Sequence, residues 1–140
     1  MEQATILPPV FALAVLTFGI ALWMGRLRFL AVRRGDLSPR YYELNRGGKV
    51  PDYLAKVSQN YDNLLELPIL FYVLTCLLFV SQQVELAQVV MAWLFVGSRY
   101  VHSYIHTTTN ILKPRMRSFL FGAFVLMAMW LLFMFRVLLA

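Results

Sequence analysis

The sequence contains little charge and almost no cysteine. Charged residues make up 14% of its 140 positions, with 13 basic and 7 acidic side chains, whereas 60% of the residues are hydrophobic. A soluble domain of this size is nearer half apolar, so the composition does not fit one. The single cysteine, Cys76, excludes a disulfide within the chain. No segment repeats and none is of low complexity.

Long segments without any charge are the main positive feature. Three of them cover 3–25, 67–84 and 118–135, and a fourth apolar segment, 86–105, is interrupted by one arginine and one histidine. Each charge-free segment has about 18 residues or more, enough for a helix to cross roughly 30 Å of hydrocarbon. We therefore predict an all-α membrane protein with one domain, 1–140, built as a bundle of four transmembrane helices. The predicted helices cover about 6–30, 62–82, 85–107 and 116–138, with a long loop at about 31–61.

The basic residues predict an orientation in the membrane. Eleven of the thirteen lie in the connections 26–60 and 107–117, and the short turn 81–85 has none. The positive-inside rule places these two connections in the cytoplasm and both termini outside, in a periplasm or lumen. The net charge of +6 then reflects topology and contact with anionic lipid. A nucleic-acid partner is excluded, because the basic residues flank spans and form no separate domain.

The first of these connections contains turn-forming residues. Pro39, Gly47, Gly48 and Pro51 break helices and favour turns. We expect an ordered loop, followed by a helix that begins near Asp52, whose side chain would cap it.

Polar side chains in two predicted spans fall on one face of each helix, at spacings of i, i+4, i+7 and i, i+3, i+7. They are Gln59, Asn63 and Glu66 in the second helix, and Arg99, His102 and His106 in the third. Glu66 and Arg99 lie almost equally far from the turn that joins these helices, which should be antiparallel neighbours. We therefore predict that Glu66 and Arg99 form a buried ion pair, because an unpaired charge is unfavourable in a bilayer. Such a pair could serve only to fix the helix register.

The other two helices supply further polar groups at the same level. Arg28 ends the first span, and Arg117 and Ser118 open the fourth. Arginines above a buried carboxylate suit a small anionic ligand that carries carboxylates of its own. The alternative for each arginine alone is that it extends toward the headgroups at the membrane surface.

Short motifs on these helices resemble a known family. They are "NLLELPILFYVL" after "KVSQNYD", "GSRYVHSYIH" before "KPRMRSF", and the weaker Gly25–Arg28 at the end of the first helix. Together they resemble the membrane-associated proteins in eicosanoid and glutathione metabolism, the MAPEG family, which includes microsomal glutathione transferases. The resemblance covers nearly the whole chain and is carried by Asn63-x-x-Glu66, Arg99-x-x-His102 and Arg117-Ser118.

The resemblance implies a homotrimer that binds glutathione as co-substrate between adjacent subunits, open to the cytoplasm. It implies that Arg117, with Ser118 beside it, stabilises the glutathione thiolate, since a nearby cation lowers a thiol pKa. The implied glutathione-binding residues are Arg28, Asn63, Glu66, Arg99, His102, His106 and Gln59. The expected activity is that of a glutathione transferase or glutathione-dependent peroxidase on lipophilic electrophiles, which would reach the site from the bilayer.

Several positions depart from the family pattern. Gln59 and Asp62 stand where many members have arginines, and His106 and Phe121 stand where phenolic hydroxyls are common. These departures favour an alternative, a non-catalytic lipid-binding or scaffold protein of the same fold. A four-span transporter fits less well, because the outer halves of the spans are almost wholly apolar.

A metal site is a further alternative at this position. His102 and His106 stand at i and i+4, which places both imidazoles on one helix face, and Glu66 would be a third ligand. Arg99 beside them disfavours a dication, so we predict that no metal is bound.

Overall fold

The computed structural model describes residues 1–140 and is helical, with no strand. The prediction of an all-α protein is therefore confirmed. The elements are η1 (Gln3–Ile6), α1 (Leu7–Arg33), α2 (Tyr41–Leu44), α3 (Asp52–Leu65), α4 (Pro68–Val80), α5 (Leu86–Thr107) and α6 (Leu112–Leu139).

Three helical segments are long and apolar enough to cross a membrane: Gln3–Arg33, Asp52–Val80 and Leu112–Leu139. The remaining predicted span, 85–107, corresponds to α5, which has the length of a span with 22 residues but a lower hydropathy. Polar side chains lower the hydropathy of α5. They are buried against the other helices of the bundle, so they need not contact lipid. They include Gln88, Ser98, Arg99, His102, Ser103 and His106.

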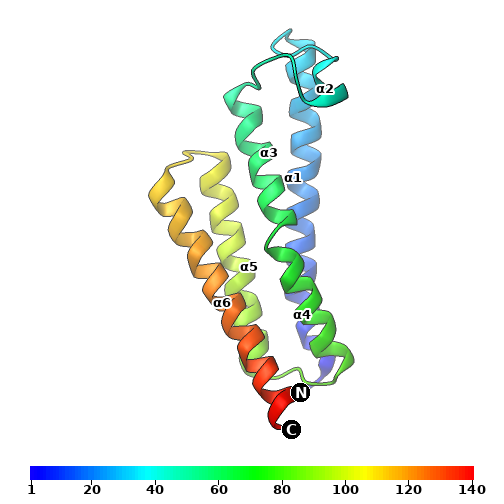
Figure 1. Cartoon of the computed structure of the whole chain (residues 1–140), viewed down its shortest axis with the longest axis vertical. Coiled ribbons are helices and arrows are strands. Elements are labelled where there is room, and N and C mark those ends of the chain that lie inside the picture. Colours follow the sequence, from blue (N-terminus) through cyan, green and yellow to red (C-terminus); the bar gives the residue numbers. More distant parts are fainter.

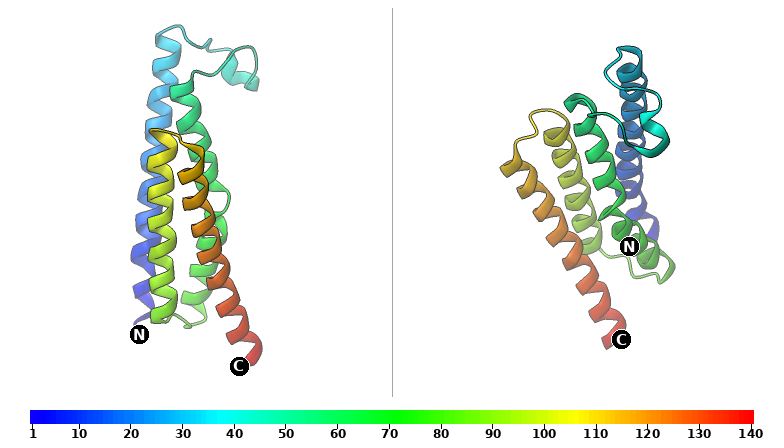
Figure 2. Two further views of the ribbon diagram at one scale, coloured as in Figure 1. Left: turned by 90° about the vertical axis from the view of Figure 1, so that its left-hand side faces the viewer. Right: turned by 45° about the horizontal axis from the view of Figure 1, so that its top comes forward.

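The helices run alongside one another as an elongated bundle (Figure 1). The α1 helix packs against α3, α5 packs most extensively against α6, and both α1 and α3 contact α5, which joins the two pairs. Both termini lie at one end of the bundle, and the α2 segment lies at the other, as the further views in Figure 2 also show. The α1–α3 end extends beyond the turn between α5 and α6.

The second predicted span differs from the structure in its start and continuity. It begins at Asp52 rather than near 62, and it breaks between α3 and α4 at Glu66 and Leu67. Pro68 causes the break, because a proline has no N–H to donate to the preceding turn and its ring disfavours continuous helix. The connection after α1 is therefore the shorter segment 34–51, not 31–61, and it contains α2.

The break also changes which helices are neighbours. We expected the segments on either side of the 81–85 turn to run as close antiparallel partners, but the backbone of α4 approaches α6 and α1 instead of α5. Contact between α4 and α5 is made by side chains, with the rings of Phe71 and Phe95 stacked at a centroid distance of 4.9 Å. Below the break, α4 thus leans away from α5.

The helix expected to begin near Asp52 does begin there, but its cap and the start of α6 differ from expectation. Pro51 occupies the cap position of α3 and Asp52 is its first residue, without a side-chain capping bond, so the predicted cap is wrong. The α6 helix begins at Leu112, four residues before the predicted start. The preceding turn is closed by Asn110, which adopts the left-handed conformation at φ 52° and donates its N–H to the Ile105 carbonyl at 2.7 Å.

The apolar core runs along the bundle between the helices. Phe71, Leu74, Phe95 and Met129 are fully buried. Many large apolar side chains instead remain exposed around the outside, as expected where lipid is the solvent. Buried polar groups gather on α5 nearer the α2 end, and this region is where a ligand could bind.

Candidate functional site

A polar hollow with a volume of about 600 Å³ lies between α3, α5 and α6. It brings together Asn63 and Glu66 from the first motif with His102 from the second. Its lining residues are Gln59, Asp62, Asn63, Glu66, His102, His106, Arg115, Met116, Phe119 and Leu120. Five of the predicted glutathione-binding residues are therefore neighbours in space.

His102 is the best-connected side chain of the hollow. Its Nδ1 lies 3.1 Å from the Arg115 carbonyl oxygen, which can only accept, so Nδ1 carries the proton. Its Nε2 then accepts from Asn63 Nδ2 at 3.5 Å. This bridge joins all three helices and holds the amide of Asn63 at the hollow. The ring of His106 lies edge-on to that of His102 at 5.6 Å, and its Nδ1 has no partner.

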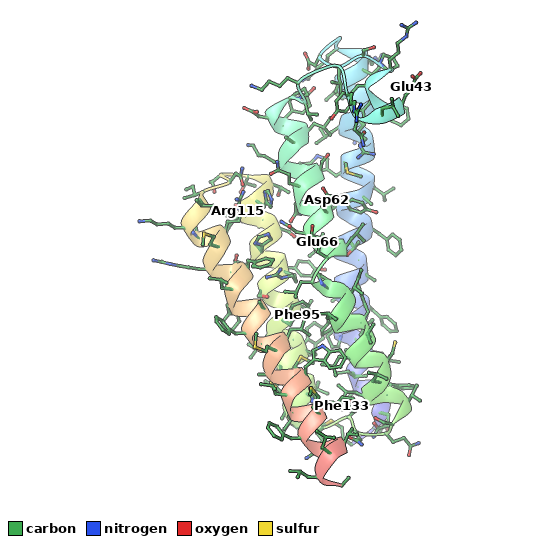
Figure 3. All side chains as sticks on the ribbon, viewed as in Figure 1. Glu43, Asp62, Glu66, Phe95, Arg115 and Phe133 are labelled. Atoms are coloured by element: carbon green, nitrogen blue, oxygen red, sulfur yellow. The ribbon has the colours of Figure 1, made fainter.

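Arg115 is the one arginine that lines the hollow. Its Nη1 donates to Asn110 Oδ1 at 2.6 Å, so the turn before α6 holds the guanidinium in place. Figure 3 shows Arg115 on α6 across from Asp62 on α3 and from Glu66 in the break that follows it. A guanidinium facing two carboxylates suits a ligand that carries both signs of charge.

Arg99 lies beneath the hollow and not in it. Its side chain is 1% exposed and donates from Nη2 to the carbonyl oxygens of Ser118 and Phe119, at 3.2 and 3.1 Å. The guanidinium carbon also lies 5.4 and 4.9 Å from the ring centroids of Phe95 and Phe119, so aromatic faces enclose the charge. Its Nε and Nη1 have no partner.

The predicted ion pair between Glu66 and Arg99 is therefore wrong. Glu66 is exposed, and the single ion pair of the structure joins Glu85 to Arg136 at the opposite end of α5 and α6. The physical reason is the break in the second span. Glu66 has a non-helical backbone there (φ −89°, ψ −94°), so helical spacing no longer predicts where its side chain points.

Arg28 lines a second hollow that adjoins the main one. It is exposed and lines a volume of about 360 Å³ between α1, α2 and α3, which shares Gln59 and Asp62 with the main hollow. Its guanidinium carbon lies 5.7 Å from the ring centroid of Tyr42. Burial raises the pKa of the Tyr42 phenol, and the nearby Arg28 opposes that rise, so the phenol stays neutral at physiological pH.

Arg117 and Ser118 lie on the other side of α6. Together with Trp93, Val101 and Phe121 they line a mostly apolar hollow of about 590 Å³ between α5 and α6. The Ser118 hydroxyl donates to the Arg115 carbonyl oxygen at 2.9 Å within the helix. Within one chain, these two residues thus lie apart from the five that meet in the main hollow.

Sequence reasoning missed part of the lining. The sequence patterns assign no role to Met116, Phe119 or Leu120, they include Arg115 only among the basic residues of a connection, and they mark Asp62 only as a departure from the family pattern. A signal was available on α6, because residues 115, 116, 119 and 120 recur at helical spacing and share a face. No group of three His, Cys, Asp or Glu side chains is close enough to hold a metal ion.

Comparison with known proteins supports the motif resemblance. The family model described as MAPEG family matches residues 6–135, nearly the whole chain. Curated proteins and solved structures give no match. The matched range contains every residue that lines the main hollow, and the helical bundle with membrane-length apolar segments fits such a protein. The chain therefore belongs to the MAPEG family of membrane proteins of eicosanoid and glutathione metabolism.

Proposed function

We propose that the protein is a membrane-bound glutathione transferase or glutathione-dependent peroxidase that acts on lipophilic electrophiles. The observation that carries the proposal is the polar hollow at which Asn63, His102 and Arg115 meet from three helices, in a chain of this family. Glutathione is a tripeptide with two carboxylates, one ammonium group and two peptide units. A site for it needs cations, acceptors and amide partners close together.

The lining of the hollow matches these groups. Asp62 and Glu66 can accept from the ammonium group, and Arg115 can donate to a carboxylate. Asn63 offers an amide for a peptide unit. Arg28 lies in the adjoining hollow and would receive the second carboxylate of a ligand that extends past Gln59.

We assign the stabilisation of the glutathione thiolate to Arg117, with Ser118 in a secondary role. A thiol with an ordinary pKa of about 8.5 is mostly protonated at pH 7, and a nearby guanidinium raises its thiolate fraction. Arg117 is exposed on the far side of α6, next to an apolar hollow. The proposal therefore has glutathione bound between subunits of a homotrimer, with Arg117 of one subunit reaching the hollow of the next.

The apolar hollow beside Arg117 suits the second substrate. Its lining by Trp93, Val101 and Phe121 offers a lipophilic molecule a route from the bilayer to the thiolate. In the transferase reaction the sulfur attacks an electrophilic carbon, a carbon–sulfur bond forms, and the leaving group departs or a strained ring opens. In the peroxidase reaction two glutathione molecules are oxidised to the disulfide while a hydroperoxide is reduced to an alcohol and water.

The orientation is part of the proposal. The basic connections on either side of the main hollow would face the cytoplasm, where glutathione is available, and both termini would face the periplasm or lumen.

One observation favours a second function, lipid binding without catalysis. The main hollow contains two carboxylates and one arginine from the same chain, and the Ser118 hydroxyl is already bonded within α6. A hollow of that charge is a weaker anion site than one lined by several arginines.

The test compares the two functions directly. Purified protein in mild detergent is titrated with glutathione by calorimetry, and the ultraviolet absorbance of the bound thiolate is recorded. Catalysis predicts saturable binding, thiolate absorbance at neutral pH and turnover with a lipophilic electrophile or hydroperoxide. Absence of both binding and turnover over a panel of such substrates would leave lipid binding as the function.

A further inference from the structure

The outer face of α1 carries a continuous apolar stripe that no other part of the chain covers. The exposed side chains recur at i, i+4, i+7, i+11 and i+18, which is one face of a helix. They are Phe11, Val15, Phe18, Leu22 and Phe29, each at least 60% exposed. Such a face is suited to lipid acyl chains.

The stripe ends in two arginines. Arg26 and Arg33 follow at i+15 and i+22 from Phe11, so they continue the same face, on either side of Phe29. Both are exposed and neither takes part in an ion pair. They lie about 10 Å apart along the helix axis, which is within reach of one headgroup for two long side chains.

A surface hollow lies between these arginines. Trp23, Leu27, Phe29 and Leu30 line it together with Arg26 and Arg33, and its volume is about 460 Å³. A second, almost wholly apolar hollow of about 490 Å³ lies on the other side of Phe29, beneath the connection to α2, with Arg28 in its lining. Phe29, 82% exposed, thus separates two apolar grooves that both end at arginines.

No carboxylate competes for this cationic surface. Asp36 is the one acidic residue between positions 3 and 42, and its Oδ2 accepts from Tyr53 Oη at 2.7 Å. The surface is therefore cationic at the end of an apolar stripe, which matches the chemistry of a phospholipid with a net negative headgroup and two acyl chains.

We propose that Arg26 and Arg33 bind the headgroup of one anionic phospholipid, whose acyl chains lie on either side of Phe29. The headgroup site at Arg26 and Arg33 shares no lining residue with the hollow between α3, α5 and α6 or with the adjoining one, so binding of the headgroup does not require glutathione. It differs from diffuse attraction to an anionic surface because it is confined to one helix face and includes a defined aromatic wedge.

Trp23 is a built-in reporter for the test. It lines the hollow and is 41% exposed. With Trp93 and Trp130 changed to Phe, its fluorescence is measured in nanodiscs of phosphatidylcholine that contain a small fraction of doxyl-labelled phosphatidylglycerol or doxyl-labelled phosphatidylcholine. The site predicts much stronger quenching by the labelled phosphatidylglycerol.

Substitution of the two arginines tests whether they cause the preference for phosphatidylglycerol. Arg26→Gln and Arg33→Gln should each lower the preference for phosphatidylglycerol about fivefold. The control Arg46→Gln removes the same charge from the exposed connection and should leave the preference unchanged. Each variant is checked for the thermal stability and oligomeric mass of the parent.

Three outcomes would overturn the proposal. Equal quenching by both labelled lipids would mean that the headgroup is not recognised. An equal loss of preference in Arg46→Gln would mean that net charge acts without a site. Absence of quenching by either lipid would mean that a second copy of the chain covers the α1 face.

Discussion

Arg115 and Arg117 are two residues apart in α6, yet they line different hollows. Arg115 faces Asp62 and Glu66 across the polar hollow, and Arg117 opens onto the apolar one beside Trp93. Residues at i and i+2 on a helix point about 200° apart, so neither can take the other's place. The two arginines should therefore have different effects on activity.

Arg115→Ala should raise the KM for glutathione about tenfold or more with little change in kcat, because it removes a charge-assisted bond to the ligand. Arg117→Ala should lower kcat by at least about tenfold and raise the pKa of the bound thiol, because it removes the cation assigned to the thiolate. Steady-state kinetics and a pH titration of thiolate absorbance separate the two effects.

The control for both changes is Arg40→Ala, on the exposed connection outside these hollows. It should alter neither constant. If Arg115→Ala and Arg117→Ala act identically on KM and kcat, the separate roles are wrong.

Gly122→Ala should destabilise the protein by about 1–3 kcal/mol. A Cβ at Gly122 would lie 2.8 Å from Arg99 Nη2 and would also clash with Ser98 Oγ, and both groups are buried. The matched change Gly19→Ala meets nothing within 4 Å and should be neutral or slightly stabilising. Thermal unfolding in detergent measures both, and an unaffected Gly122→Ala protein would show that Arg99 is free to move.

Glu66 and Arg99 should contribute independently to stability. Arg99→Ala removes a buried side chain and its two bonds to α6 carbonyls, so it should cost about 2–4 kcal/mol. Glu66→Gln should leave stability nearly unchanged, because the side chain is exposed. A double-mutant cycle should give a coupling below about 0.5 kcal/mol. A coupling of several kcal/mol would restore the ion pair.

The contact between Tyr53 and Asp36 should make the stability of the protein decrease at alkaline pH. The hydrogen bond to the Asp36 carboxylate raises the pKa of Tyr53 above its ordinary value of 10.0. A phenol with a raised folded-state pKa contributes stability that is complete below the unfolded pKa and is lost as pH rises through the folded one. In Tyr53→Phe, the unfolding temperature should therefore decrease less steeply than in the parent as pH rises above about 10.

Tyr42 titrates in the same direction because burial raises its pKa, so only the difference between parent and variant is informative. Asp36→Asn should make this decrease less steep as well, since it removes the carboxylate. A curve for Tyr53→Phe that superimposes on the parent's would show that this contact does not affect stability.

Helix type and helix faces followed well from the sequence. Helical spacing placed Asn63 and His102 on the polar faces of two helices expected to be neighbours, and their side chains lie 3.5 Å apart. The burial of Arg99, His102 and His106 on one side of α5 followed from the same periodicity. These successes share a cause, because all depend on unbroken helix with a fixed angle per residue.

The wrong predictions follow where that regularity stops. The pairing of Glu66 with Arg99 assumed continuous helix through Pro68, and the fourth helix was expected to begin at about 116 instead of Leu112. Pro68 indicates a break in the helix, but the sequence does not predict the direction that the chain takes after the break. The separation of Arg115 from Arg117 became visible only when the neighbours of α6 were placed.

The break at Glu66 and Leu67 divides the second span into two helices that are oriented separately. Above it, α3 shapes the polar hollow with its lining side chains; below it, α4 contributes Phe71 and Leu74 to the apolar core. Because no intrahelical N–H bond can form at Pro68, small tilts of α3 need not propagate into α4. The shape of the polar hollow and the packing of the apolar core are thus set by two separately oriented helices of one segment, so a substitution in α3 can alter the hollow while α4 keeps its packing.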